Sequence, residues 1–311
     1  MHRRALLALA LAAPALARAQ GASPLPVVAS FSILGDMVRQ IGGDQVAVHV
    51  IAGPDVDAHS FQPRPSDAQA LRGAALVLRN GLGFDAWMDR LLNAAGAAPA
   101  AVTATEGIAA RQIPDEDRDG HAHERKQEHE HEAGAPDPHA WQDLRHGQTY
   151  VRNIAAALQV ADPARAAAFQ RGAEAYLRRL ATLDGWVRAQ IATVPEARRK
   201  VVTSHDAFGY FGAAYGVRFL APQGVSTESE PSAAQVAQLI RTLKREGITA
   251  VFLENMANPA TLRRLAAEAG VKVQGRLYAD ALSPADGPAP TYEAMFRHNL
   301  GLLVPAMRGA G

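Results

Sequence analysis

The chain has 311 residues, of which 48% are hydrophobic and 20% are charged, and its formal net charge is +1. This composition is typical of a globular protein long enough for two domains, and it excludes a chain that is disordered throughout. The balanced charge gives no support to nucleic acid or an anionic membrane surface as a partner. The sequence contains no cysteine, which excludes disulfides, thiolate metal ligands and a lipid-modified cysteine.

The N-terminal sequence predicts export. Arg3 and Arg4 precede an apolar stretch, and small residues, Ala17 and Ala19, follow it. This pattern is that of a secretory signal peptide, so we expect residues 1–19 to be removed. A membrane anchor is the alternative, but the apolar stretch is shorter than the ~20 residues that a span requires. A diffusible exported protein needs an outer membrane to retain it, so we expect a soluble protein of the periplasm.

The sequence from residue 20 to 160 alternates between short β-branched stretches and amphipathic stretches. Strands separated by helices predict parallel βαβ units, whose ligand sites lie at the carboxyl ends of the strands. His59 follows the second predicted strand, in a loop where prolines prevent a continuous helix and Ser66 with Asp67 offers an N-cap for the next one. The predicted strands are 27–30, 45–51 and 74–78, and the predicted helices are 33–41, 84–94 and 145–158.

A long helix follows, capped by Asp162 and Pro163 and extending to about residue 192. At about 1.5 Å per residue it spans tens of ångströms, so we interpret residues 161–194 as a connector between two lobes. Residues 195–311 then repeat the strand and helix order of the first lobe. The predicted fold class is α/β, with two lobes that each contain a mostly parallel sheet flanked by helices, joined by one long rigid helix. The second lobe has predicted strands at 200–203, 217–221, 250–253 and 271–277, and helices at 232–245, 259–269 and 291–303.

Four side chains share a position at the predicted ends of strands. They are His59 in GPDVDAHSFQPRPSD, His139 in PDPHAWQD, His205 in VVTSHDAFGYF and Asp280 in GRLYADALSPADG. A single loop histidine is as often hydrogen-bonded to backbone as bound to metal. Three imidazoles and a carboxylate, however, are a complete first shell for a tetrahedral ion such as zinc. Outside the predicted signal peptide and the histidine-rich run, the other three histidines, His49, His146 and His298, lack this context, and we interpret them as structural or surface residues.

Residues 115–135 form a charged stretch without periodicity, which predicts a surface loop. A charged run is usually a solvated surface. Its imidazoles are spaced so that they can also gather a weakly held second ion, and we hypothesise that the loop captures zinc and passes it toward the main site. The candidate auxiliary ligands are His121, His123, His129 and His131.

Carboxylates near the candidate ligands are less specific. Ligating imidazoles normally donate their other N–H to an acceptor, and Glu254, Glu228 and Glu230 are candidates for that role. Asp206 can be explained equally well as a helix cap. The sequence leaves these assignments open.

Five segments carry a family resemblance that covers nearly all of the chain after residue 20, in one order. The chain resembles the metal-binding solute-binding proteins, cluster A-I, of bacterial ABC transporters for zinc and manganese. The segments are VVASFSILGDMVRQIGGDQVAVHVIAGPDVDAHSFQPRPSDAQAL, PDPHAWQD, VVTSHDAFGYFGAAYGVRFL, VFLENMANPATLRRLAAEAGVKV and LYADAL.

The resemblance implies two α/β lobes joined by a rigid helix, with one metal ion between them. By position, His59 and His139 resemble the ligands of the first lobe, and His205 and Asp280 those of the second. Manganese-binding members of the family have a carboxylate where this chain has His205, so the resemblance favours Zn²⁺ as the transported ligand. It also implies an ABC transporter permease as partner and a monomer. The segment APQGVSTESEPSAAQVAQLI is most similar to zinc proteins that work with a separate periplasmic zinc chaperone, a candidate second partner.

Two function classes remain to be compared. The first is a binding protein that captures periplasmic zinc and delivers it to a permease for import, with a manganese-binding homologue as the alternative within the family. The second is a zinc hydrolase, since three histidines and an open position also describe catalytic sites. Asp280 fills the fourth position, and the sequence has neither an HExxH helix nor a GxSxG elbow. We therefore expect a binding protein and not an enzyme.

Overall fold

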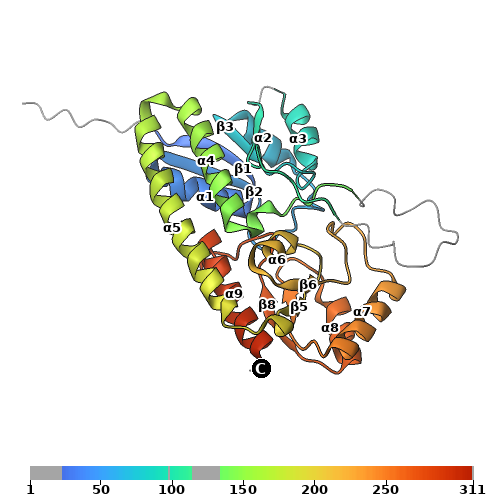
Figure 1. Ribbon diagram of the computed structural model, residues 1–311. Coiled ribbons are helices and arrows are strands. Elements are labelled where there is room, and N and C mark those ends of the chain that lie inside the picture. The colour runs from blue at the N-terminus through green and yellow to red at the C-terminus, as the bar shows by residue number, and fades with distance from the viewer. Residues whose placement is uncertain (1–22, 97–98, 114–133, 310–311) are drawn as a thin grey trace, which may run out of the picture.

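The computed structural model describes residues 23–96, 99–113 and 134–309. It contains two parallel four-stranded sheets, in the orders β2-β1-β3-β4 and β6-β5-β7-β8, each flanked by helices (Figure 1). The predicted fold class is confirmed. The strands are β1 (Leu25–Phe31), β2 (Val46–Ala52), β3 (Leu76–Arg79), β4 (Ala101–Thr103), β5 (Lys200–Val202), β6 (Arg218–Leu220), β7 (Val251–Glu254) and β8 (Val273–Leu277).

The helices follow the strands along the chain as crossover connections. In the second lobe, α7 begins with a capping box between Ser232 and Gln235, and α8 begins with an Asn258 cap and ends at Gly270 in the left-handed conformation. The helices are α1 (Ser32–Gly42), α2 (Pro65–Arg72), α3 (Trp87–Ala95), α4 (Leu144–Ala161), α5 (Ala166–Ala192), α6 (Gly209–Tyr215), α7 (Ala233–Glu246), α8 (Pro259–Ala269) and α9 (Tyr292–Arg308).

The long helix α5 runs along both lobes in Figure 1 and packs against α1 and α4 of the first lobe and against α9. Its apolar side chains recur every three or four residues, which places them on one buried face. Gly172 lies so close to α1 that a Cβ atom there would stand 2.0 Å from the Ile41 carbonyl oxygen. The buried residues of α5 are Phe169, Ala173, Tyr176, Leu180, Leu183, Val187 and Ile191.

Three local predictions differ from the structure. The N-cap of α2 is Arg64 rather than Ser66, because Pro65 takes the first helical position and Asp67 accepts from the Arg64 N–H at 2.7 Å. The helix α9 continues beyond the predicted end and includes Pro305. The short elements β4 and α6 were not predicted, because three and seven residues carry too little periodicity.

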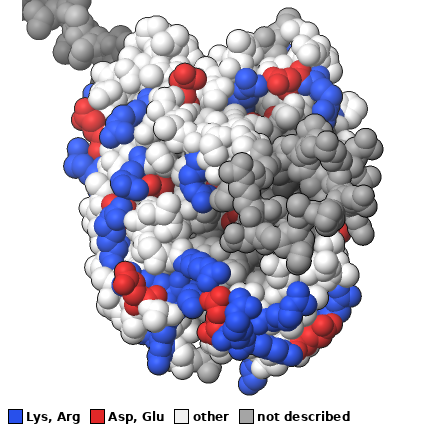
Figure 2. All heavy atoms as spheres, turned by 45° about the vertical axis from the view of Figure 1, so that its right-hand side comes forward, with Lys and Arg blue, Asp and Glu red and all other residues white. Residues whose placement is uncertain are grey.

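Lys and Arg side chains gather on the lower part of the face in Figure 2, which belongs to the second lobe. Glu246 pairs there with Lys200 at 2.9 Å and with Arg218 at 2.8 Å. The Arg198 guanidinium donates to the Arg308 carbonyl in the last turn of α9, at 2.7 Å. A cation at a helix C-terminus is favourable, so Arg198 stabilises the C-terminal end of α9. Within the described residues, no helix is long and apolar enough to cross a membrane.

Candidate metal centre

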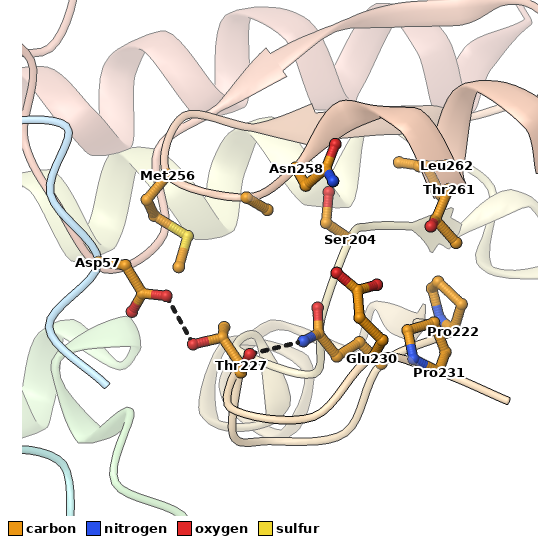
Figure 3. Close-up of a pocket in the computed structure, with 12 residues that line it drawn as sticks. Asp57, Ser204, Pro222, Thr227, Glu230, Pro231, Met256, Asn258, Thr261 and Leu262 are labelled. Carbon is orange, nitrogen blue, oxygen red and sulfur yellow. Dashed lines mark hydrogen bonds between the residues drawn. The ribbon is translucent and has the colours of Figure 1, made fainter. Parts of the chain in front are cut away.

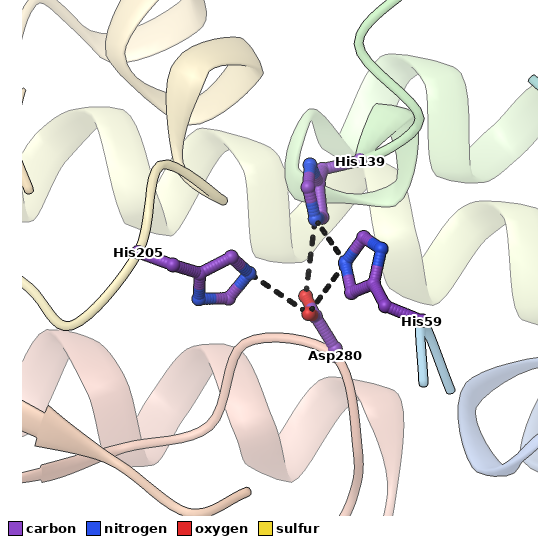
Figure 4. A group of neighbouring side chains, drawn as sticks. All are labelled: His59, His139, His205 and Asp280. Atoms are coloured by element: carbon purple, nitrogen blue, oxygen red, sulfur yellow. Dashed lines mark hydrogen bonds and ion pairs between the residues drawn. The ribbon is translucent and has the colours of Figure 1, made fainter. Parts of the chain in front are cut away.

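The structure brings together all four predicted ligands of the main site (Figure 4). The Asp280 carboxylate lies 3.3 Å from His59 Nε2, 3.0 Å from His205 Nε2 and 3.6 Å from His139 Nε2. The two first-lobe imidazoles are 3.2 Å apart between their Nε2 atoms. Four ligands about 2.0–2.1 Å from a tetrahedral zinc ion stand roughly 3.3 Å from one another. The separations given above bracket this value and the four ligand atoms all lie within 4.8 Å of one another, so they can surround one small ion.

Three of the four groups are fully buried and His59 is partly buried, and several of their polar atoms have no protein partner suited to them. His139, His205 and Asp280 have no exposed surface. Among the described residues, both carboxylate oxygens of Asp280 and the Nε2 atom of His205 lack a hydrogen-bond partner. Polar atoms buried without a hydrogen bond are costly, so their convergence on one point fits a cation at that point.

The first lobe holds His59 in the loop after β2 and His139 in the segment just before α4, so in the described residues His139 does not follow a strand as predicted. The Trp87 indole donates to the Ala58 carbonyl at 2.7 Å, and the His59 N–H donates to the Asp57 carboxylate at 2.9 Å. Asp137 Oδ1 accepts from both the backbone N–H of His139, at 3.0 Å, and its Nδ1, at 2.9 Å. Because a carboxylate only accepts, Nδ1 carries the proton and Nε2 is left for the ion.

Aromatic rings enclose the same two imidazoles. The Phe84 ring lies 4.7 Å from the ring of His59 and 6.0 Å from that of His139, both edge to face. Trp141 lies 5.2 Å from His139. This packing restricts the imidazole rings and lowers the local dielectric, which strengthens electrostatic interactions within the site.

The second lobe holds His205 at the end of β5 with one carboxylate from β7. Glu254 accepts from the Nδ1 of His205 and from the backbone N–H groups of Ser204, at 2.8 Å, and of His205, at 3.1 Å. Asp280 follows β8, and its neighbour Ala279 receives hydrogen bonds through its carbonyl from the Trp141 indole and the Gln142 amide, both at 2.9 Å. The segment that carries His139 is thus bonded directly to the segment that carries Asp280.

Burial and mutual charge set the protonation of the cluster in the absence of an ion. Burial lowers the pKa of His59. Burial also opposes the charged form of His139, but Asp280 and Asp137 outweigh it and raise the pKa of His139 to about 9. Burial opposes ionisation of Asp280 as well, yet the imidazolium groups of His205 and His139 hold its pKa well below the usual range. A metal ion that binds here must therefore displace protons.

A pocket of about 190 Å³ lies beside the cluster and is bordered by both lobes (Figure 3). Asp57 approaches it from the first lobe, and Ser204, Glu230 and Thr227 from the second. The Thr227 hydroxyl donates to the Asp57 carboxylate at 2.7 Å across the lobes. Asp57 and Ser204 are close in sequence to His59 and His205. The residues around this pocket therefore connect the first-lobe part of the site with the second-lobe part.

The open assignments from the sequence divide clearly. Glu254 is the acceptor for His205, whereas Glu228 and Glu230 are exposed and have no hydrogen bond to any of the three cluster imidazoles in the described structure. Asp206 is not a helix cap, since α6 begins three residues later with no side-chain cap. Asp137 was missed, although its place two residues before His139 was a signal. The histidine-rich run with His121, His123, His129 and His131 lies outside the described residues, as does the predicted signal peptide.

Comparisons with known proteins identify the family of this chain. Residues 27–306 match the family described as ZnuA, zinc-uptake complex component A periplasmic. The manganese-binding lipoprotein MntA of Halalkalibacterium halodurans is 31% identical, over 97% of this chain and 95% of that protein. The iron-binding protein YfeA of Yersinia pestis is 31% identical, over 87% and 82%.

The solved structure of the periplasmic zinc binding protein TroA from Treponema pallidum matches with a TM-score of 0.80 at 30% identity. The match covers 92% of this chain and 99% of that chain. A relative from Streptococcus sanguinis, 27% identical over 89% of this chain and 87% of that protein, is named a metal ABC transporter substrate-binding lipoprotein. The relatives differ in the metal that their names carry. The chain belongs to this family, whose members are metal-binding substrate-binding proteins of ABC transporters.

Proposed function

We propose that the protein captures Zn²⁺ between its lobes and delivers it to an ABC transporter permease for import. His59, His139, His205 and Asp280 are the proposed ligands. The observation that carries the proposal is the convergence of three Nε2 atoms on one fully buried carboxylate, with all four ligand atoms within 4.8 Å of one another. An imidazole-rich shell suits zinc, whereas oxygen-rich shells suit manganese.

Zinc is favoured over manganese by His205, because this position supplies nitrogen where a carboxylate would supply oxygen. Relatives are named for manganese, iron and zinc, so the choice of metal rests on this shell. A hydrolase is disfavoured because Asp280 fills the position that a catalytic zinc site leaves open for water. The mechanism needs no chemistry on the ion, only deprotonated ligands and a separation of the lobes that releases it.

The test is metal content and a competitive zinc titration of wild type, His205→Ala and His49→Ala. His49 lies exposed in β2 and serves as the matched control, since it removes an imidazole elsewhere. We expect one tight zinc per wild-type and His49→Ala chain, unaffected by excess manganese. His205→Ala should lose more than the roughly 10- to 100-fold in affinity that removal of an outer hydrogen-bond partner costs.

His205→Glu sharpens the choice of metal, because it replaces one nitrogen ligand by oxygen. We expect this variant to bind manganese more tightly relative to zinc than wild type does. Tight manganese binding by wild type, or zinc binding indifferent to His205, would overturn the proposed metal and ligand set.

The place of action and the partners are part of the proposal. We propose that residues 1–19 direct export to the periplasm, which predicts a mature N-terminus at Gln20, to be read by N-terminal sequencing. Some relatives are named lipoproteins, but this sequence has no cysteine to carry a lipid. A periplasmic zinc chaperone and a monomeric state complete the proposal, to be tested by zinc-transfer measurements and by light scattering.

The histidine-rich run is proposed as an auxiliary zinc-capturing segment with His121, His123, His129 and His131 as ligands. Deleting residues 120–132 should remove weak additional zinc equivalents and leave the single tight site intact. Calorimetry separates the two classes of site. Loss of the tight site in the deletion would contradict this division of roles.

A further inference from the structure

One tyrosine of the second lobe reaches into the first lobe next to a metal ligand. Tyr210, in the first turn of α6, is 3% exposed, and its ring packs edge to face on His146 of α4 at a centroid distance of 5.4 Å. The adjacent Gly209 lies so close to the first lobe that a Cβ atom would stand 1.9 Å from Arg111 Nη1 and 2.8 Å from Asp137 Oδ2. A side chain at residue 209 would therefore displace either the Arg111 guanidinium from Asp137 or α6 from the first lobe.

The Tyr210 hydroxyl uses both of its hydrogen-bonding capacities on first-lobe backbone. It accepts from the Arg111 N–H at 2.8 Å and donates to the Asp137 carbonyl at 3.1 Å. These two residues are also paired with each other, since the Asp137 N–H donates to the Arg111 carbonyl at 2.8 Å. The Tyr210 hydroxyl of the second lobe thus holds two chain segments of the first lobe, one that precedes and one that follows residues 114–133 in the sequence.

The same two residues position His139. The Arg111 guanidinium donates to Asp137 Oδ2 at 2.9 Å, which leaves Oδ1 for the backbone N–H and Nδ1 of His139. Asp137 is 1% exposed, so water does not supply hydrogen bonds to its carboxylate. These side-chain contacts lie within the first lobe, but Tyr210 holds the backbone of Arg111 and Asp137 that carries them only while α6 is docked on the first lobe.

We propose that Tyr210 is a cross-lobe positioning residue that orients the proposed ligand His139 through Asp137 and so slows the release of the bound ion. The inference rests on the proposed metal-binding function. Separation of α6 from the first lobe removes the hydroxyl from the Arg111 N–H and the Asp137 carbonyl, which frees the backbone that carries the Asp137 carboxylate and so loosens His139. Docking of the lobes and the geometry of a first-lobe ligand are thereby one coupled event.

The test is Tyr210→Phe, which removes one oxygen and keeps the ring. The matched control is Tyr176→Phe, because the Tyr176 hydroxyl is buried in α5 without a hydrogen-bond partner in the described residues. Zinc dissociation is followed by stopped flow with excess chelator, and the visible spectrum of the Co²⁺-loaded protein reports ligand geometry. We expect Tyr210→Phe to release zinc roughly 2- to 10-fold faster, the range for loss of a hydrogen bond, with a changed cobalt spectrum.

Tyr176→Phe should match wild type in both measurements. Gly209→Ala is a second variant, and it should accelerate release in the same direction by keeping α6 away from Arg111. Thermal unfolding of the metal-free variants separates a general loss of stability from the positioning effect, because a merely structural role lowers the melting temperature and leaves the cobalt spectrum unchanged. Wild-type release rates and spectrum in Tyr210→Phe would overturn the inference, whereas absence of tight zinc in wild type would overturn the proposed function instead.

Discussion

The two lobes hold their ligands in different ways. In the first lobe, β1 and β2 pair from Leu25 and Val46 to Phe31 and Ala52, and the sheet belongs to the large core that also contains the buried face of α5. In the second lobe, β5 and β7 are paired through Val202 and Val251 alone, and the outer face has a separate small core between α7 and α8.

The difference indicates which part of the molecule can move. His59 and His139 are fixed by a continuous core and by the aromatic rings of Phe84 and Trp141. His205 depends on Glu254 at the end of a short strand. Small shifts of α7 and α8 can therefore alter the side of the site that carries His205, while α6 stays docked on the first lobe and the first-lobe imidazoles stay in place.

The largest expected effect comes from removing one buried leucine from each of the two cores and comparing the results. Leu78→Ala in the first lobe and Leu265→Ala in the second each remove a fully buried side chain, at a cost of about 2–5 kcal/mol in unfolding free energy. We expect Leu78→Ala to weaken zinc binding as well, whereas Leu265→Ala should keep zinc binding and increase hydrogen exchange in α7 and α8. Urea unfolding, zinc titration and exchange measurements check this. Equal loss of zinc affinity in both variants would mean that the cores unfold as one unit.

Asp137→Asn and Glu254→Gln compare the carboxylates that orient the imidazoles. Removing such a partner costs roughly 10- to 100-fold in metal affinity. We expect Glu254→Gln to be the more damaging, because His139 also packs against Trp141 and Phe84. Competitive zinc titration measures both, with Glu246→Gln, on the far side of the second lobe, as control. A larger loss in Asp137→Asn would reverse the comparison.

The folding stability of the metal-free protein should depend on pH through the titration of His139. Its pKa is raised to about 9, above the ordinary value of 6.5, by Asp280 and Asp137 despite burial. Because the folded protein binds this proton more tightly than the unfolded chain, the stabilisation is fully present below about pH 6.5 and is lost as the pH rises through about 9. Melting temperatures of metal-free protein should fall over that range. His139→Ala and zinc-loaded protein should show a smaller fall, and an equal slope in all three would refute the assignment.

The smallest effect concerns the border between the lobes beside the pocket. Thr227→Val removes the hydroxyl that donates to Asp57 and keeps the side-chain volume. We expect a loss of about 1 kcal/mol, read as faster zinc release with nearly unchanged melting temperature. Thr193→Val, at the exposed end of α5, is the control. Unchanged release would show that this bond does not contribute to holding the lobes together.

The sequence was sufficient to predict the two parallel sheets apart from β4, the long helix and the four residues that converge. Parallel strands place their carboxyl ends at one edge, which accounts for His59, His205 and Asp280, whereas His139 follows no strand of the described structure directly. It was insufficient where contacts join residues distant in the chain. Asp137 pairs with Arg111 across 26 residues of sequence, and Tyr210 bonds to Arg111 and Asp137 across 99 and 73 residues. No local sequence pattern encodes these contacts. The choice among Glu254, Glu228 and Glu230 likewise required the register of β5 beside β7.

The complete burial of His139, His205 and Asp280 has a kinetic consequence. A chelator in solution cannot touch an occluded ion, so exchange proceeds by spontaneous opening followed by capture. The release rate then rises with chelator concentration only until the chelator captures the ion faster than the protein recloses. The plateau in the release rate equals the opening rate. The lifetime of the cargo becomes a property of the fold, and a permease that holds the lobes apart can shorten it without competing for a single ligand.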